Sequence, residues 1–119
     1  MRMRVLIVED EALVAMMVED AVESAGHDIA AVVSNITDAV AAVVRGDFDV
    51  ALLDMNLHGQ KAHALPVTLK ARGTPFAFVT GYSQSGILDK FADAPVVTKP
   101  FRFEDIAKAL TSLSAALVR

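Results

Sequence analysis

The chain of 119 residues is 54% hydrophobic and 22% charged, which predicts one globular domain over residues 1–119 and leaves no room for an effector domain. It has no cysteine, which excludes disulfides and thiol nucleophiles, and no apolar run long enough for a bilayer span or a signal peptide, so we expect a cytoplasmic protein without a membrane partner. Its formal net charge of −4 and its scattered basic residues argue against a nucleic-acid partner, because phosphate binding needs clustered lysine and arginine.

Short apolar runs along the chain predict strands. They cover residues 5–8, 30–33, 50–53, 78–79 and 96–98. Continuous apolar runs, as opposed to alternating ones, are typical of strands that are buried on both faces of a parallel sheet. We expect Phe76 and Phe78 to be core residues on opposite faces of the fourth strand.

Helical patterns lie between these runs. The first covers residues 11–25 and ends at Gly26, and its apolar positions are Leu13, Met16, Met17 and Val22. We expect both methionines to pack in the core. The second helix begins at the cap Asn35 and ends at Gly46.

The remaining helical patterns differ in strength. A third helix is predicted over residues 66–72, and Gly73 ends it. The fourth, over residues 87–92, should be short because glycine and serine surround its start. The last begins at about Phe103 and has one clear apolar face, made of Ile106, Leu110, Leu113 and Leu117.

Strands and helices therefore alternate five times along the chain. Parallel strands need right-handed helical crossovers, so this order predicts an α/β fold, a three-layer α/β/α sandwich around a five-stranded parallel sheet. At this size the flavodoxin-like strand order 2-1-3-4-5 is the common solution. Its switch point lies between the first and third strands, where ligands of such sheets bind.

Polar side chains follow four of the five strands. Glu9 and Asp10 follow the first strand, Asp54 the third, Thr80 the fourth and Lys99 the fifth. Because the carboxyl ends of parallel strands meet at one edge of a sheet, we expect these side chains to converge. Acidic residues at the end of a single strand are usually only solvated, but their repetition on neighbouring strands favours a binding site.

Three crowded carboxylates repel one another unless a cation lies among them. An all-oxygen site that keeps several waters suits Mg2+. We predict that Asp10 and Asp54 are direct ligands, that Glu9 binds through a water, and that the backbone carbonyl of Asn56 is a further ligand.

The same residues are suited to phosphoryl transfer. Asp54 is the predicted nucleophile, and the Lys99 ammonium and the Thr80 hydroxyl would bind phosphoryl oxygens. Gly81 has no side chain, which would leave the phosphoryl group open to a histidine ring or to water.

These motifs together resemble a response-regulator receiver domain of two-component signalling, of the CheY-like type, over the whole chain. They are Glu9-Asp10, the segment around Asp54, Thr80-Gly81 and Lys99-Pro100. The resemblance implies that a histidine kinase or histidine phosphotransferase transfers a phosphoryl group to Asp54, and that hydrolysis removes it. It also implies a cis peptide bond before Pro100. The output would be an unknown downstream protein, or the chain would act as a phosphate sink.

A narrower resemblance concerns residues 73–82. They are similar to the receiver subgroup nicknamed FAT GUY, with Val79 where that subgroup has alanine. The position of the usual aromatic switch of receivers is Val96 here, so Tyr82 or the ordering of residues 81–86 is expected to replace it. We also expect Phe91 and Phe103 to offer apolar contacts to a partner.

Two other protein classes share parts of this pattern. A haloacid-dehalogenase-like phosphatase also uses an aspartate nucleophile, magnesium, threonine and lysine, but its second acid is replaced by Asn56 here, and the chain has no cap domain. A flavodoxin-like FMN carrier has the same fold, but Glu9, Asp10 and Glu11 would repel its phosphate.

Overall fold

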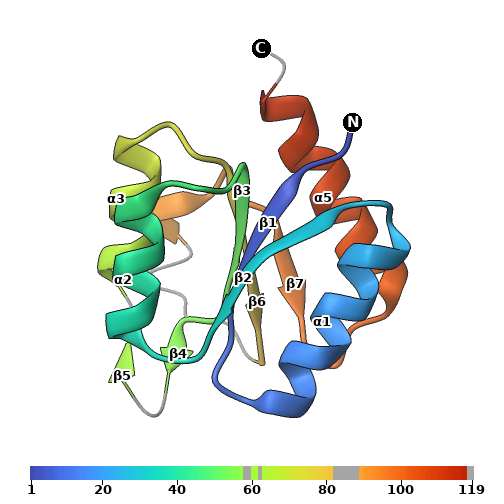
Figure 1. Cartoon of the computed structure of the whole chain (residues 1–119), viewed down its shortest axis with the longest axis horizontal. Helices are drawn as coiled ribbons and strands as arrows, with labels where there is room; N and C mark the ends of the chain where they lie inside the picture. Colours follow the sequence, from blue (N-terminus) through green and yellow to red (C-terminus); the bar gives the residue numbers. More distant parts are fainter. Residues whose placement is uncertain (58–59, 62, 82–88, 118–119) are drawn as a thin grey trace.

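The computed structural model describes residues 1–57, 60–61, 63–81 and 89–117. A five-stranded parallel sheet of order β2-β1-β3-β6-β7 forms the middle layer, and within this sheet alone the order is 2-1-3-4-5, as predicted. Figure 1 shows α1 and α5 on one side of the sheet and α2 and α3 on the other. The three-layer sandwich is therefore confirmed.

The strands of this sheet lie close to the predicted apolar runs. They are β1 Arg4–Val8, β2 Asp28–Val33, β3 Val50–Leu53, β6 Phe76–Thr80 and β7 Val96–Thr98. Every residue of β3 and β6 is buried, as continuous apolar runs require when helices cover both faces.

The helices also follow the predicted order. They are α1 Ala12–Ser24, α2 Ile36–Arg45, α3 Ala64–Ala71 and α5 Phe103–Leu117. Asn35 caps α2 by accepting a hydrogen bond from the backbone N–H of Asp38 at 2.8 Å, and Gly46 ends that helix with a φ of 69°.

The fourth helix differs from the prediction. Of the predicted range 87–92, the described residues form only a 3-10 turn, η1 Asp89–Phe91. A short antiparallel hairpin of β4 Asn56–Leu57 and β5 Gln60–Lys61 was not predicted, because two-residue strands leave no periodic pattern.

The buried face of α1 was predicted wrongly. Leu13, Met16 and Met17 are 71%, 58% and 40% exposed. Of the predicted positions only Val22 is buried, and it shares the buried face with Ala15, Val18 and Ala21. These smaller side chains recur every three to four residues and allow α1 to pack closely on the sheet and on α5, which leaves the long side chains facing outward.

The phenylalanines of β6 lie on the same face, which corrects the prediction of opposite faces. Residues two apart in a strand share a face, and the rings of Phe76 and Phe78 meet edge to face with centroids 5.5 Å apart. Phe91 joins them, 5.7 Å from Phe76, and is only 8% exposed, so it is not available to a partner. Phe103 is exposed. On the predicted apolar face of α5, Ile106, Leu110 and Leu113 are buried and Leu117 is half-buried.

The sheet separates two hydrophobic clusters. The cluster under α1 and α5 includes Val18, Leu52 and Leu110, and the cluster under α2 and α3 includes Leu53 and all three buried phenylalanines. Successive residues of β3 thus serve opposite cores, as a doubly covered strand requires.

The corrected face of α1 can be tested with two alanine substitutions in that helix. Val18→Ala should lower the free energy of unfolding by about 1–3 kcal/mol, because it removes buried apolar atoms and leaves a cavity. Met16→Ala removes more atoms but should change the free energy of unfolding by less than about 0.5 kcal/mol, because the Met16 side chain is exposed. Urea denaturation measures both free energies of unfolding. A larger loss of stability in Met16→Ala than in Val18→Ala would show that Met16 lies on the buried face after all.

Candidate functional site

The ends of neighbouring strands hold the acidic residues in place. Glu9 follows β1, and its backbone N–H donates to the carbonyl of Val33 at 3.0 Å. Asp54 follows β3, and its N–H donates to the carbonyl of Val8 at 2.9 Å. The backbone hydrogen bonding of the sheet therefore continues to the residues that carry the carboxylates, and fixes where they lie.

Three carboxylates converge at this edge, as predicted. Glu9, Asp10 and Asp54 each offer one oxygen, and these atoms lie within 4.8 Å of one another. Glu9 is 3% and Asp54 is 5% exposed, so two of the three carboxylates are removed from bulk water.

Lys99 lies directly against two of these carboxylates. It follows β7, and its Nζ lies 2.8 Å from Oε1 of Glu9 and 3.2 Å from Oδ2 of Asp54. Its backbone N–H donates to the carbonyl of Thr80 at 2.8 Å, and the peptide bond to Pro100 is cis, as expected. The sequence predicted that Lys99 would be near Asp54, but its contact with Glu9 was missed.

Thr80 and Gly81 lie at the same edge of the sheet. Thr80 is the last residue of β6, is 4% exposed and pairs with Thr98 of β7. A Cβ built on Gly81 would meet no atom of the described residues within 4 Å. Among the described residues, no side chain or backbone atom therefore fills the space next to Gly81.

Two backbone N–H groups support the carboxylates and were not identified from the sequence. The N–H of Asn56 donates to Oδ1 of Asp54 at 3.1 Å, and that of Glu11 donates to Oε2 of Glu9 at 3.2 Å. Asn56 lies two residues after Asp54, which is the spacing of an Asx turn, so a search for such turns would have found this contact. The contact of Glu9 has the same spacing but is made by a glutamate, which such a search does not include. Tyr82 and the other residues of 82–86, which were expected to replace the aromatic switch, lie outside the described residues.

Burial and charge shift the pKa values of this ion pair. Burial raises the pKa of Glu9 to about 7; the ammonium of Lys99 opposes this shift, and the carboxylate of Asp54 adds to it. For Lys99, burial lowers the pKa, but the carboxylates of Glu9 and Asp54 outweigh burial, so the pKa is raised above its usual value. Lys99 is therefore cationic at neutral pH.

The site has the features that a divalent cation needs. Three carboxylates face the single ammonium of Lys99 within the described residues. That one ammonium lies 2.8 Å from Oε1 of Glu9 and 3.2 Å from Oδ2 of Asp54. Three converging carboxylates beside a single ammonium fit a hard cation such as Mg2+.

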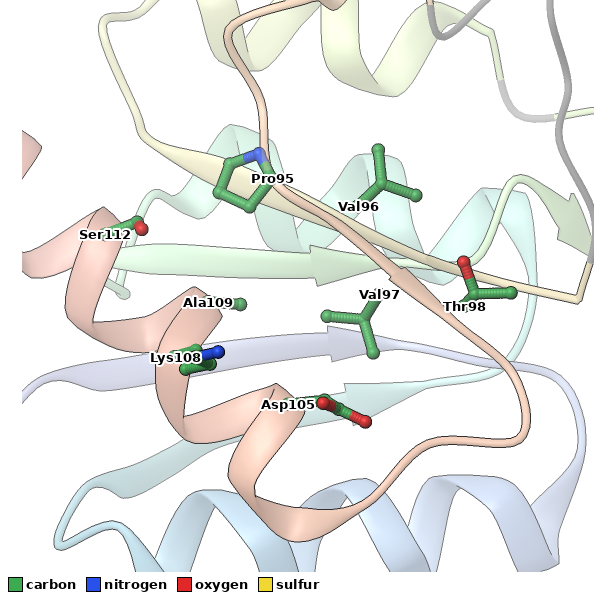
Figure 2. A pocket seen from close by; sticks show the side chains of 8 residues that line it. All are labelled: Pro95, Val96, Val97, Thr98, Asp105, Lys108, Ala109 and Ser112. Carbon is green, nitrogen blue, oxygen red and sulfur yellow. The ribbon is translucent and has the colours of Figure 1, made fainter.

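A separate groove of about 360 Å³ lies between β7 and α5. Figure 2 shows Val97 on the side of β7 toward α5 and Val96 on the opposite side, with Asp105 and Lys108 projecting from the helix. None of the three acidic residues lines this groove, so it is not part of the acidic site. Val96, at the position of the usual aromatic switch, is 46% exposed.

Among the helices of the described chain, none combines the length and the apolar character required to cross a membrane.

Known proteins share this sequence pattern and this fold. SdrG from Sphingomonas melonis Fr1 is 41% identical, with a TM-score of 0.84 over 95% of this chain and 97% of that one. The receiver (REC) domain of PhyR from Erythrobacter litoralis is 35% identical, with a TM-score of 0.77 over 98% of this chain and 91% of that one.

Curated relatives are longer than this chain. The transcriptional regulatory protein TcrA of Mycobacterium tuberculosis is 30% identical over 118 residues, which cover 93% of this chain and 46% of the relative. The chain thus spans about half the length of TcrA. The family model described as response regulator receiver domain matches residues 5–111. The chain therefore belongs to the family of response regulator receiver domains.

Proposed function

We propose that Asp54 is the residue of this receiver domain that accepts a phosphoryl group, and that the donor is a phosphohistidine of a histidine kinase or histidine phosphotransferase. The observation that supports this most strongly is the position of Asp54, which is buried at the end of β3, within the acidic cluster and 3.2 Å from the Lys99 ammonium. As a receiver of two-component signalling, the protein signals through its phosphorylation state and not through turnover of a substrate.

In the proposed transfer, a carboxylate oxygen of Asp54 attacks phosphorus. The P–O bond forms as the P–N bond to the donor imidazole breaks, and the imidazole nitrogen keeps the electron pair. The Lys99 ammonium is close enough to move onto a phosphoryl oxygen, and Thr80 at the adjacent strand end would offer its hydroxyl to another. Attack of water on phosphorus then releases phosphate and restores the carboxylate.

The expected cofactor is Mg2+. Asp10 and Asp54 would bind it directly, Glu9 through a water, and the backbone carbonyl of Asn56 would complete the protein ligands. When bound, the ion neutralises charge on the phosphoryl oxygens. In the resting site Lys99 offsets part of the same carboxylate charge, so the ion and Lys99 share the task of neutralising Glu9 and Asp54.

The phosphorylated form would act on a downstream protein, or the chain would drain phosphate from its kinase. No feature of the site or of the relatives favours the haloacid-dehalogenase-like phosphatase, and the position two residues after Asp54 holds Asn56, which has no acidic group.

The acceptor can be identified by mass spectrometry after treatment with acetyl phosphate and magnesium. One phosphoryl group should appear on the wild type and should be lost in Asp54→Asn, which keeps the size of the side chain but removes the nucleophile. Asp93→Asn, at an exposed aspartate away from the cluster, is the matched control and should be labelled normally. Label that persists in Asp54→Asn would identify a different acceptor.

Magnesium should stabilise the fold through the acidic cluster. At 100 times the dissociation constant, a ligand that binds only the folded state adds about 2.7 kcal/mol. Asp10→Asn should lose most of this gain, because it removes one of the three converging carboxylates. The thermal midpoint with and without magnesium measures the effect, and Asp20→Asn, on the exposed side of α1, is the control. An equal magnesium response in all three proteins would place the ion elsewhere.

The raised pKa of Glu9 predicts how the stability of the magnesium-free protein depends on pH. Because the pKa of Glu9 is about 7 in the folded state and 4.5 in the unfolded state, its contribution is fully present below pH 4.5 and is lost as the pH rises to about 7. The loss amounts to roughly 3 kcal/mol at most, converted from the shift in pKa.

The part of the stability loss that comes from ionisation of Glu9 should disappear when its carboxyl group is replaced. Unfolding by urea in EDTA, from pH 4.5 to 8, should show a smaller decline in Glu9→Gln than in the wild type. The exposed neighbour provides the control Glu11→Gln, which should keep the wild-type profile. Parallel profiles for the wild type and Glu9→Gln would show that Glu9 is ionised in the folded state without cost.

A further inference from the structure

His27 lies in the turn between α1 and β2, at the end of the sheet away from the acidic cluster. Its ring Nδ1 accepts a hydrogen bond from the backbone N–H of Met3 at 3.0 Å. A ring nitrogen can accept only when it carries no proton, so this contact requires the neutral tautomer with the proton on Nε2.

The segment that His27 holds is tied to several elements. The backbone N–H of Asp28 donates to the carbonyl of Met3 at 2.9 Å, and Arg2 contacts both carboxylate oxygens of Asp28 at 2.8 Å and 2.7 Å. The Met3 side chain is fully buried in the cluster under α1 and α5, and Ser114 of α5 donates to Sδ of Met1 at 3.4 Å. Residues 1–3 thus connect β2, α5 and the α1–β2 turn, and Figure 1 shows this segment beside the last turns of α5.

The charges around His27 do not favour its protonation. Burial lowers the pKa of His27 and the α-amino group of Met1 lowers it further, while the Asp28 carboxylate opposes both effects. That carboxylate is already paired with Arg2, and Glu23, in the last turn of α1, is exposed. The neutral ring is therefore the resting form above the ordinary histidine pKa of 6.5.

We propose that His27 is a proton-operated clasp that holds residues 1–3 on the sheet when it is neutral and releases them when it is protonated. A protonated Nδ1 would point its own N–H at the N–H of Met3, so two donors would face each other where one hydrogen bond stood. The opened segment takes up the proton more readily than the closed one, so falling pH favours opening. This device lies apart from the phosphoacceptor site and does not depend on its assignment.

Amide hydrogen exchange of Met3, followed by NMR between pH 7.5 and 5 and corrected for intrinsic rates, tests the clasp. Protection should fall as the pH drops below about 6.5, by up to tenfold for each pH unit while only the open segment binds the proton. His27→Gln should flatten this dependence, because an amide oxygen can accept the same hydrogen bond but does not titrate in this range. His63→Gln, at an exposed histidine, should leave it intact.

Global unfolding can be separated from opening of the clasp by comparing two amides. The amide of Leu52, in the central strand, reports unfolding of the whole domain and lies apart from the contact between His27 and Met3. A fall in the protection of Met3 that Leu52 does not share would support the clasp. The NMR titration of the His27 ring in the wild type should give a midpoint below the ordinary histidine value of 6.5, because the closed segment disfavours the proton. Protection of Met3 that is independent of pH, or that falls equally in His27→Gln, would overturn the proposal.

Discussion

The crowding of carboxylates at one edge of a buried parallel sheet is the constraint on which the site depends. Side chains at adjacent strand ends must lie close together, and two of the three carboxylates are also shielded from water. The strands that carry them are buried over their whole length beyond the first residue of β1, and continued backbone hydrogen bonding fixes the residues that follow. The charges therefore cannot separate to relieve their repulsion, which is offset instead by Lys99, by protonation of Glu9 or by a bound cation. Lys99 supplies one positive charge, and the remaining excess of negative charge is the reason that the site suits a divalent ion.

The sequence was sufficient to predict the sheet and the residues at its edge, because both depend on simple rules. Continuous apolar runs indicate doubly buried strands, and parallel topology then brings Glu9, Asp54 and Lys99 together without any knowledge of side-chain conformation. The contact between Lys99 and Glu9 was not predictable in this way. The flexible side chain of Lys99 can reach the carboxylates of both Glu9 and Asp54, and only the packed structure determines which of them the ammonium contacts.

The face of α1 was not predictable because apolar residues occur almost all round this helix. Long side chains such as Met16 score as more hydrophobic than alanine, but the close approach of α1 to the sheet and to α5 favours small residues at the contact. The fourth helical segment was predicted to be short because its local sequence has little helical preference, and its described part is the 3-10 turn η1. The packing of Phe91 against the aromatic rings of β6 was not predictable from this local pattern.

The division of the core by the sheet has a consequence for how the sequence can change. Side chains such as Leu52 and Leu53 are neighbours in the chain but fill different cores, so a loss of volume on one side cannot be compensated by a larger residue on the other. Compensating substitutions should therefore pair within a core: the aromatic residues of β6 with η1, and α1 with α5. Substitutions on opposite sides of the sheet should combine more nearly additively. During evolution, the residues of the two hydrophobic clusters can therefore change independently of each other. Both clusters must keep the shared strands in place, because the residues at the ends of these strands form the acidic site.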